Sequence, residues 1–173
     1  ITGYGPESEE RDRAAYDIGA FWARSGVAMS LTAPDHDIPQ QRGGMGDHMT
    51  GLGAAGAVAA ALFHRERTGE GQRVAASLIR TGVYMMAWDV SLALRLGADV
   101  STYDRFHAVN PIIDCYRAKD GRWFWLLLLQ ADRHWPDLIR AIERPDLAED
   151  ARFRDITARR EHAPELVAEL DKV

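Results

Sequence analysis

The chain has 173 residues, of which 46% are apolar and 27% are charged. Its 26 aspartates and glutamates outnumber 21 lysines and arginines, which gives a formal net charge of −5. A chain of this length and apolar content can bury a core, so disordered, collagen-like and low-complexity classes are excluded. The acidic balance argues against a nucleic-acid-binding surface, and no apolar run approaches the ~20 residues that a membrane span needs.

The cellular setting is indicated by a single cysteine, Cys115. It has no partner for an intramolecular disulfide, so a cytoplasmic protein is expected. The chain opens at Ile1, and its first six residues resemble the end of a strand followed by a Gly/Pro turn. We therefore expect these residues to be an interior piece of a longer protein.

The first predicted element is a helix over 12–25, where apolar residues recur at helical spacing. Gly26 is placed to end it in the left-handed conformation. Residues 29–46 are predicted as a long irregular loop because they contain Pro34, Pro39 and three glycines. Loops of this length inside a compact domain are uncommon unless they carry function.

A second helix is predicted over 49–67 and is rich in glycine and alanine. Because glycine costs about 1 kcal/mol in a helix interior, its small residues predict close packing on a neighbour. Polar and apolar residues alternate closely enough over 72–78 to predict a strand. A third helix is expected from Ser77 or Thr81 to about Gly97. This strand, turn and helix order indicates an α/β region.

A β-hairpin is predicted after a polar connection over 98–110. Its strands are residues 111–118 and 122–129, and the intervening Asp-Gly is typical of a type I′ turn, which needs positive φ at both central positions. The three aromatic residues at 123–125 alternate between the faces of a strand and are expected in the core and at an interface. Cys115 is expected to be a small packed residue and not a nucleophile.

The rest of the chain is predicted to be helical, over 133–142 and from 164 to the end. The pattern therefore changes from α/β to a hairpin followed by helices near residue 105. We expect one domain at 1–104 and part of a small α+β domain at 105–173.

The most specific chemical feature is the stretch Arg-Gly-Gly-Met-Gly-Asp-His at 42–48. A carboxylate at the start of a helix is favoured in its ionised form by about 0.3–1 kcal/mol at exposed sites. Asp47 is therefore a candidate nucleophile toward an activated carbonyl. Gly44 and Gly46 leave room for a bulky acyl group, and glycine N–H groups here are candidates to face a developing oxyanion. On spacing alone, the favoured interpretation is that Asp47 only caps the helix.

Two other patterns are weaker. Residues 51–56 match the dinucleotide-binding pattern G-x-G-x-x-G, but a loop precedes them in place of a buried strand. Residues 35–37, Asp-His-Asp, have no second cluster at metal-ligand spacing. Neither a nicotinamide site nor a metal site is therefore predicted.

Several motifs accompany the Gly-Asp pair at 46–47. The turn Arg-x-Arg-Thr-Gly-x-Gly-Gln at 65–72 is the most diagnostic one. The others are Gly3-Tyr4-Gly5, Tyr16-Asp17, Ser25-Gly26, Asn110-Pro111, Tyr116-Arg117, Asp120-Gly121-Arg122-Trp123 and Arg144-Pro145-Asp146-Leu147. Together they resemble, over nearly the whole chain, the class III CoA-transferases, which include carnitine CoA-transferase, formyl-CoA transferase and α-methylacyl-CoA racemase.

The resemblance implies that the chain is the central part of such an enzyme. Helices and a strand of a Rossmann-like large domain would be followed by part of a small domain. Asp47 would attack the thioester of a donor acyl-CoA to give a mixed anhydride. The released CoA thiolate would then form an aspartyl-CoA thioester, which the acceptor carboxylate resolves. Coenzyme A esters are thus expected as substrates, with no tightly bound cofactor.

The resemblance also implies where CoA and substrate bind. The expected contacts are Arg13, Tyr16 and Asp17 from one segment and Gly44, Gly46 and His48 from another. Arg13 is almost as well explained as a solvated surface residue. His48 is better explained as a histidine on the surface or just outside the direct substrate contacts.

The racemases of this family carry a histidine in place of Tyr16. Racemisation needs two acid/base groups on opposite faces of the α-carbon, and a phenol, whose reference pKa is about 10, is a poor partner near neutral pH. Tyr16 therefore favours CoA transfer, although His48 beside Asp47 weakens that preference. A non-catalytic paralogue that keeps the fold for dimer packing is a third interpretation.

Two family segments are absent from these 173 residues. One is the upstream segment with an Asn-x-Arg-Pro-Gly type motif, and the other is the C-terminal return that completes the first domain. The isolated chain is therefore expected to be inactive. The resemblance implies an interlocked homodimer in bacterial metabolism, without a nucleic-acid or membrane partner. The donor acyl group and acceptor acid depend on pocket shape, which sequence patterns do not reveal.

Overall fold

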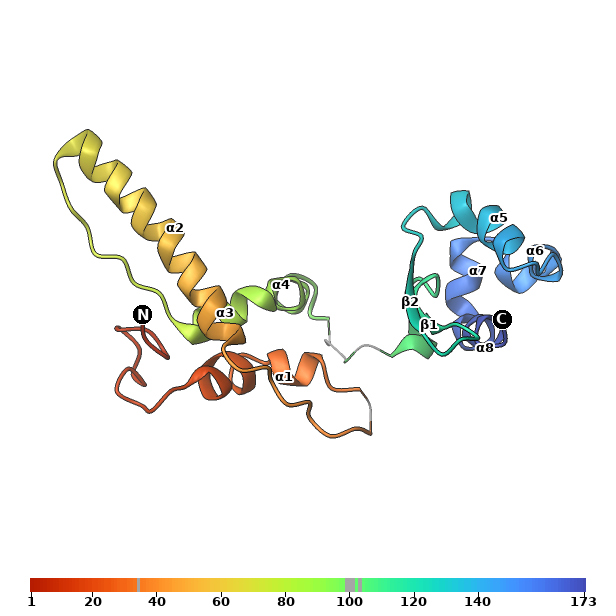
Figure 1. The fold of residues 1–173 in the computed structure, drawn as a ribbon, viewed down its shortest axis with the longest axis horizontal. Coiled ribbons are helices and arrows are strands. Elements are labelled where there is room, and N and C mark those ends of the chain that lie inside the picture. Colours follow the sequence, from red (N-terminus) through yellow and green to blue (C-terminus); the bar gives the residue numbers. More distant parts are fainter. Residues whose placement is uncertain (34, 99–101, 103) are drawn as a thin grey trace. The chain divides into compact units, whose positions relative to one another are not determined.

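The computed structural model describes residues 1–33, 35–98, 102 and 104–173 (Figure 1). The chain forms two compact units, Ile1–Thr102 and Tyr103–Val173. Each unit has a hydrophobic cluster of its own. No described helix combines the length and the apolar character needed to cross a membrane.

The first unit is built from helices. They are the π-helix η1 (Asp17–Ala23), α1 (Val27–Ser30), α2 (Met45–Thr68), α3 (Leu78–Met85) and α4 (Ala87–Leu96). The helix expected over 12–25 is thus shorter than predicted, and Gly26, with φ of 93°, lies before α1 instead of directly ending it. The described residues between α1 and α2 form no helix or strand, as expected for the predicted loop.

Helix α2 starts earlier than the predicted residue 49. It begins at Met45, after Gly44, so Asp47 lies inside its first turn. It ends at Gly69, whose left-handed φ of 78° lets its N–H donate to the Arg65 carbonyl at 2.8 Å. This ending at a glycine agrees with the usual C-terminal signal.

The predicted third helix is divided in two at Met86. Ser77 caps α3, because its hydroxyl accepts a hydrogen bond from the Arg80 N–H at 3.4 Å. Gly97, with φ of 61°, ends α4 where the pattern placed the helix end.

The prediction of a strand over 72–78 is wrong, because these residues form no strand in the described structure. The segment makes one isolated parallel bridge, between Thr2 and Ser77. The Thr2 N–H donates to the Ala76 carbonyl and the Leu78 N–H donates to the Thr2 carbonyl, both at 3.0 Å. A strand is stabilised by pairing along its length, and here only one residue offers a partner.

The second unit starts with a hairpin and continues with helices. Its elements are η2 (Arg105–His107), β1 (Ile113–Arg117), β2 (Trp123–Leu127), α5 (Ala131–Ala141), α6 (Asp146–Glu149), η3 (Ala151–Phe153), α7 (Ile156–Glu161) and α8 (Ala163–Leu170). The strands pair antiparallel, which confirms the predicted hairpin. Helices α5 and α8 were predicted, whereas α6 and α7 were not. Of the polar connection over 98–110, residues 99–101 and 103 lie outside the described residues.

The hairpin turn differs from the predicted type I′ turn. Of its residues, Gly121 alone has positive φ, at 84°, so Asp120 does not adopt the conformation that a type I′ turn requires. The Gly121 N–H donates to the Ala118 carbonyl, and the Ala118 N–H to the Arg122 carbonyl, both at 2.8 Å. The loop therefore has three residues and ends in a left-handed glycine, which is the next most common hairpin solution.

The aromatic run at 123–125 does not supply the core of the second unit. Trp123, Phe124 and Trp125 are 64%, 45% and 61% exposed, so the core part of the prediction is wrong, and the interface part stays a prediction. The core lies on the other side of the hairpin, where β1 meets the helices. Its largest buried members are Ile112, Tyr116, Trp135, Phe153 and Leu166.

In the first unit, η1 approaches the start of α2 closely at Gly46. A Cβ atom on Gly46 would lie 2.2 Å from Phe21 Cγ and 2.3 Å from Asp17 Oδ1. Phe21 itself is fully buried. The glycines at 51, 53 and 56, by contrast, have no described atom within 4 Å of an added Cβ. The start of α2 therefore packs directly on η1, and the glycines further along do not create a close contact within the described chain.

Replacing Gly46 by alanine tests this packing. Gly46→Ala should lower the free energy of unfolding by about 1–3 kcal/mol, because the new methyl group overlaps Phe21 and Asp17. Gly53→Ala is the matched control on the same helix. It should leave stability unchanged or raise it by up to about 1 kcal/mol, because alanine is the better helix former. Urea unfolding of both variants measures the difference, and coincident curves would contradict the packing at Gly46.

Candidate active site at the start of helix α2

Asp47 is an unpaired carboxylate in the first turn of α2. Its side chain is exposed and makes no hydrogen bond or ion pair with the part of the chain that the structure describes. The N-cap is Gly44, in the left-handed conformation with φ of 77°, and no side chain caps this helix. The cap alternative for Asp47 is therefore wrong, and the carboxylate is left available for chemistry.

The backbone N–H groups around Asp47 are only partly used. The Gly46 N–H donates to Asp17 Oδ1 at 2.9 Å, and the His48 N–H donates to the Gly44 carbonyl at 2.8 Å. The N–H groups of Gly43, Gly44 and Asp47 have no hydrogen-bond partner among the described residues. Such free donors at the start of a helix favour negative charge nearby.

The buried Asp17 side chain binds the start of α2 by a hydrogen bond. It is 9% exposed, and Oδ1 accepts the Gly46 N–H while Oδ2 is buried without a partner in the described structure. Gln41, just before the Arg-Gly-Gly stretch, is also buried, and neither polar atom of its side-chain amide has a partner there. Buried polar atoms are normally hydrogen-bonded, so these groups mark the region around the helix start as unusual.

His48 folds back over the residue that precedes α2. A Cβ atom on Gly44 would lie 3.1 Å from Cε1 and 3.3 Å from Nε2 of His48. Gly44 is therefore favoured both by its positive φ and by the space that the imidazole occupies. The imidazole lies at the helix start, beside the backbone that presents Asp47.

Tyr16 and Arg13 are placed differently from each other. Tyr16 precedes η1 and is 82% exposed, with its ring unpaired among the described residues. The Arg13 guanidinium donates to Glu10 at 2.6 Å, and the same carboxylate accepts from Arg24 at 2.6 Å. The structure thus brings Asp17, Gly44, Gly46, Asp47 and His48 together, whereas no described contact joins Arg13 or Tyr16 to the start of α2.

Sequence patterns missed the residues that support this site. Thr50, in the second turn of α2, is 1% exposed, and its hydroxyl donates to the Thr81 hydroxyl of α3 at 2.9 Å. Gln41 was likewise not singled out. The signal for Thr50 was the Thr-Gly pair at 50–51, which follows Gly-Asp and also resembles the class III CoA-transferases. Nothing local pointed to Thr81, which is 31 residues further along.

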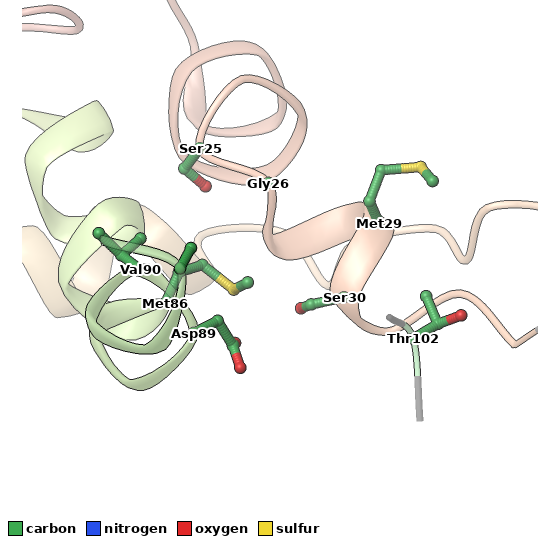
Figure 2. A pocket seen from close by; sticks show the side chains of 9 residues that line it. Ser25, Gly26, Met29, Ser30, Met86, Asp89, Val90 and Thr102 are labelled. Carbon is green, nitrogen blue, oxygen red and sulfur yellow. The ribbon is translucent and has the colours of Figure 1, made fainter. Parts of the chain in front are cut away.

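An open pocket of about 440 Å³ lies elsewhere in the first unit (Figure 2). Met86, Asp89 and Val90 line one side, and the other side includes Ser25, Gly26, Met29 and Ser30. The predicted site residues do not line it. Within the described residues, no group of three histidine, cysteine, aspartate or glutamate side chains is arranged to hold a metal ion.

Comparison with known proteins gives the family of this chain. Residues 1–173 match the model for CoA-transferase family III. The chain is 32% identical over 167 residues to (R)-2-hydroxy-4-methylpentanoate CoA-transferase of Clostridioides difficile, covering 96% of this chain and 41% of that protein. It is 31% identical over 161 residues to cinnamoyl-CoA:phenyllactate CoA-transferase of Clostridium sporogenes, covering 90% of this chain and 38% of that protein.

Solved structures give the same result for the fold. A CAIB/BAIF family protein from Brucella suis superposes with a TM-score of 0.80 at 27% identity, over 99% of this chain and 45% of that chain. The chain thus spans less than half the length of these relatives. Because the family model matches all 173 residues of this chain, the chain belongs to CoA-transferase family III.

Proposed function

We propose that the protein containing these residues is a CoA-transferase, which moves coenzyme A from an acyl-CoA thioester to a carboxylic acid. Family membership supports this function, since the two relatives above are named as CoA-transferases. The single observation of this chain that carries it is the placement of Asp47. An accessible, unpaired carboxylate lies where a helix start favours its ionised form.

The proposed reaction uses Asp47 as a covalent carrier. A carboxylate oxygen attacks the donor thioester carbonyl, the C–S bond breaks, and a mixed anhydride and CoA thiolate result. The thiolate attacks the aspartyl carbonyl, releases the donor acid as a carboxylate and leaves an aspartyl-CoA thioester. The acceptor carboxylate then attacks this thioester and displaces the thiolate, giving a second anhydride. Attack of the thiolate on the acceptor carbonyl forms the new acyl-CoA and regenerates Asp47.

No step of this sequence requires a net proton transfer, because carboxylates and thiolates replace one another. The site therefore needs an ionised nucleophile and donors for the oxyanions, and it does not need a general base. The unpaired N–H groups of Gly43, Gly44 and Asp47 are the donors that we assign to this role. They are backbone groups on a helix start, so they are already oriented before the substrate binds.

The remaining predicted residues are assigned to CoA and acyl binding. Gly44 and Gly46 carry no side chain that would obstruct an acyl group, and the imidazole of His48 lies beside them. Tyr16 offers an exposed ring next to Asp17, which contacts the helix start. Arg13 would meet a CoA phosphate only by exchanging its ion pair with Glu10, which is an exposed pair and therefore weak.

The larger setting belongs to the same proposal. Residues 1–104 would be part of a Rossmann-like large domain, residues 105–173 part of the small domain, and the whole protein an interlocked cytoplasmic homodimer. Several apolar side chains along α2 are exposed, among them Leu52, Leu62 and Phe63. Their exposure supports the proposal that another segment or a second subunit covers this helix.

Removing the carboxylate tests the nucleophile. Asp47→Asn in the full-length protein should lower CoA transfer roughly 10⁴-fold or more, because the nucleophile is lost. Intact mass spectrometry after mixing with succinyl-CoA or cinnamoyl-CoA should show a covalent adduct on the unmodified protein and none on the variant. Glu66→Gln removes one carboxylate near the other end of α2 and should keep both adduct and activity. An adduct or full activity in Asp47→Asn would refute the assignment.

The racemase alternative predicts a different isotope result. Both His48 and Asp47 belong to the first turn of α2, whereas racemisation needs acid/base groups on opposite faces of the α-carbon. We therefore expect no deuterium at the α-position when the full-length protein is incubated with a 2-methylacyl-CoA in deuterated water. Proton exchange at that carbon, measured by NMR, would favour the racemase. Absence of any CoA-ester binding by calorimetry would favour a non-catalytic paralogue.

A further inference from the structure

Helix α2 is anchored at two residues near its start. All 24 of its residues are described, and of these Gly46 and Thr50 are buried. They are four residues apart and so lie on one face of the helix. Figure 1 shows the rest of α2 extending away from α3 and η1 after this first contact. The orientation of the whole helix start therefore depends on what these two residues bind.

The anchor at Thr50 is a chain of two side-chain hydrogen bonds. The Thr50 hydroxyl donates to the Thr81 hydroxyl at 2.9 Å, and the Thr81 hydroxyl donates to the Ser77 carbonyl at 3.1 Å. Ser77 is itself fixed, because it caps α3 and because its neighbour Leu78 donates its N–H to the Thr2 carbonyl. The chain of hydroxyl groups therefore ends on backbone that other contacts hold in place.

The anchor at Gly46 leaves one motion free. The Gly46 N–H lies close to the helix axis, so its bond to Asp17 resists translation more than rotation about that axis. A side chain ends about 5–6 Å from the axis of a helix, so a rotation of 10° displaces a carboxylate by about 1 Å. A displacement of this size at a reacting atom can lower a rate about 100-fold. Asp47 lies three residues before Thr50 on the same helix. A restraint on Thr50 therefore acts directly on the direction of the Asp47 carboxylate.

We propose that Thr81 is a positioning residue for CoA transfer, which acts through the Thr50 hydroxyl to fix the rotation of the first turns of α2 and thereby the direction of the Asp47 carboxylate. Thr81 itself does not touch the substrate or the reacting atoms. The inference rests on the proposed function of Asp47 as the nucleophile.

Valine at residue 81 removes this restraint while conserving the shape of the side chain. The Thr50 hydroxyl need not stay unpaired in this variant, because a threonine in a helix can donate to the carbonyl four residues earlier, here that of Gly46. Thr81→Val should therefore fold, with the contact between Gly46 and Asp17 retained. Thr81→Ser keeps the hydroxyl and is the conservative variant that should restore the function.

The kinetic test uses the full-length protein with succinyl-CoA and cinnamoyl-CoA as donors. In Thr81→Val, the rate of adduct formation on Asp47, measured by rapid quench and mass spectrometry, should fall at least about tenfold. The dissociation constant for the donor should change less than about twofold, because no binding group is removed. Thr81→Ser should recover most of the rate. Thr68→Val, which removes an exposed hydroxyl at the far end of α2, should match the unmodified protein.

A double mutant separates this role from a general loss of stability. If both hydroxyls act as one restraint, Thr50→Val/Thr81→Val should be no slower than the slower single variant. Independent, multiplying losses in the double mutant would overturn the proposal. An unchanged adduct rate in Thr81→Val, or a loss that Thr81→Ser does not reverse, would overturn it as well.

Hydrogen exchange distinguishes failure of the positioning role from failure of the proposed function. Amides at 45–51 should exchange faster in Thr81→Val than in the unmodified protein and in Thr68→Val. If the unmodified protein forms no adduct with either donor, the exchange rates alone decide whether Thr81 restrains α2. Unchanged exchange at 45–51 in Thr81→Val would overturn the restraint whatever the activity.

Discussion

The hydrogen bond from the Gly46 N–H to the buried carboxylate of Asp17 is the contact on which the candidate site depends. It joins residues 29 positions apart and lies at 2.9 Å between two side-by-side elements, η1 and α2. Hydrogen bonds to charged groups contribute about 1.5–3 kcal/mol, more than most neutral ones. The same approach requires glycine at 46, because any Cβ would enter the Phe21 ring. This contact holds the backbone next to Asp47, whereas the direction of the Asp47 carboxylate depends on the rotation of the helix start.

Two carboxylates of the second unit, Asp146 and Asp150, differ from Asp47 in having a cationic partner. The guanidinium of Arg144 lowers the pKa of the Asp146 carboxyl below its ordinary value, and Arg152 does the same for Asp150. These carboxylates are held in ion pairs, where their lone pairs are occupied. Asp47 has no such partner in the described structure, and the backbone of its helix start favours its charge instead. Its oxygens are therefore not occupied by a cation within the described residues.

Local patterns were sufficient where local interactions decide the structure. The Gly-Asp motif, the end of α2 at Gly69 and the hairpin all depend on residues close in sequence. The strand over 72–78 could not be predicted correctly, because a strand depends on neighbours that alternation does not reveal. The exposure of Trp123 and the roles of Asp17 and Thr81 depend on packing between distant segments. For the candidate site, sequence patterns therefore singled out the proposed nucleophile, whereas the contacts that hold it were visible only in three dimensions.

The central claim is that Asp47 carries the covalent intermediate, and the most direct measurement is to locate the modified residue within the chain. The full-length protein is mixed with succinyl-CoA or cinnamoyl-CoA, treated with hydroxylamine and digested, and its peptides are sequenced by mass spectrometry. Hydroxylamine converts an activated aspartyl carbonyl to a stable hydroxamate, so the account predicts a hydroxamate at Asp47 that depends on the acyl-CoA. A hydroxamate at another carboxylate such as Asp17, or none in a preparation that transfers CoA, would contradict it.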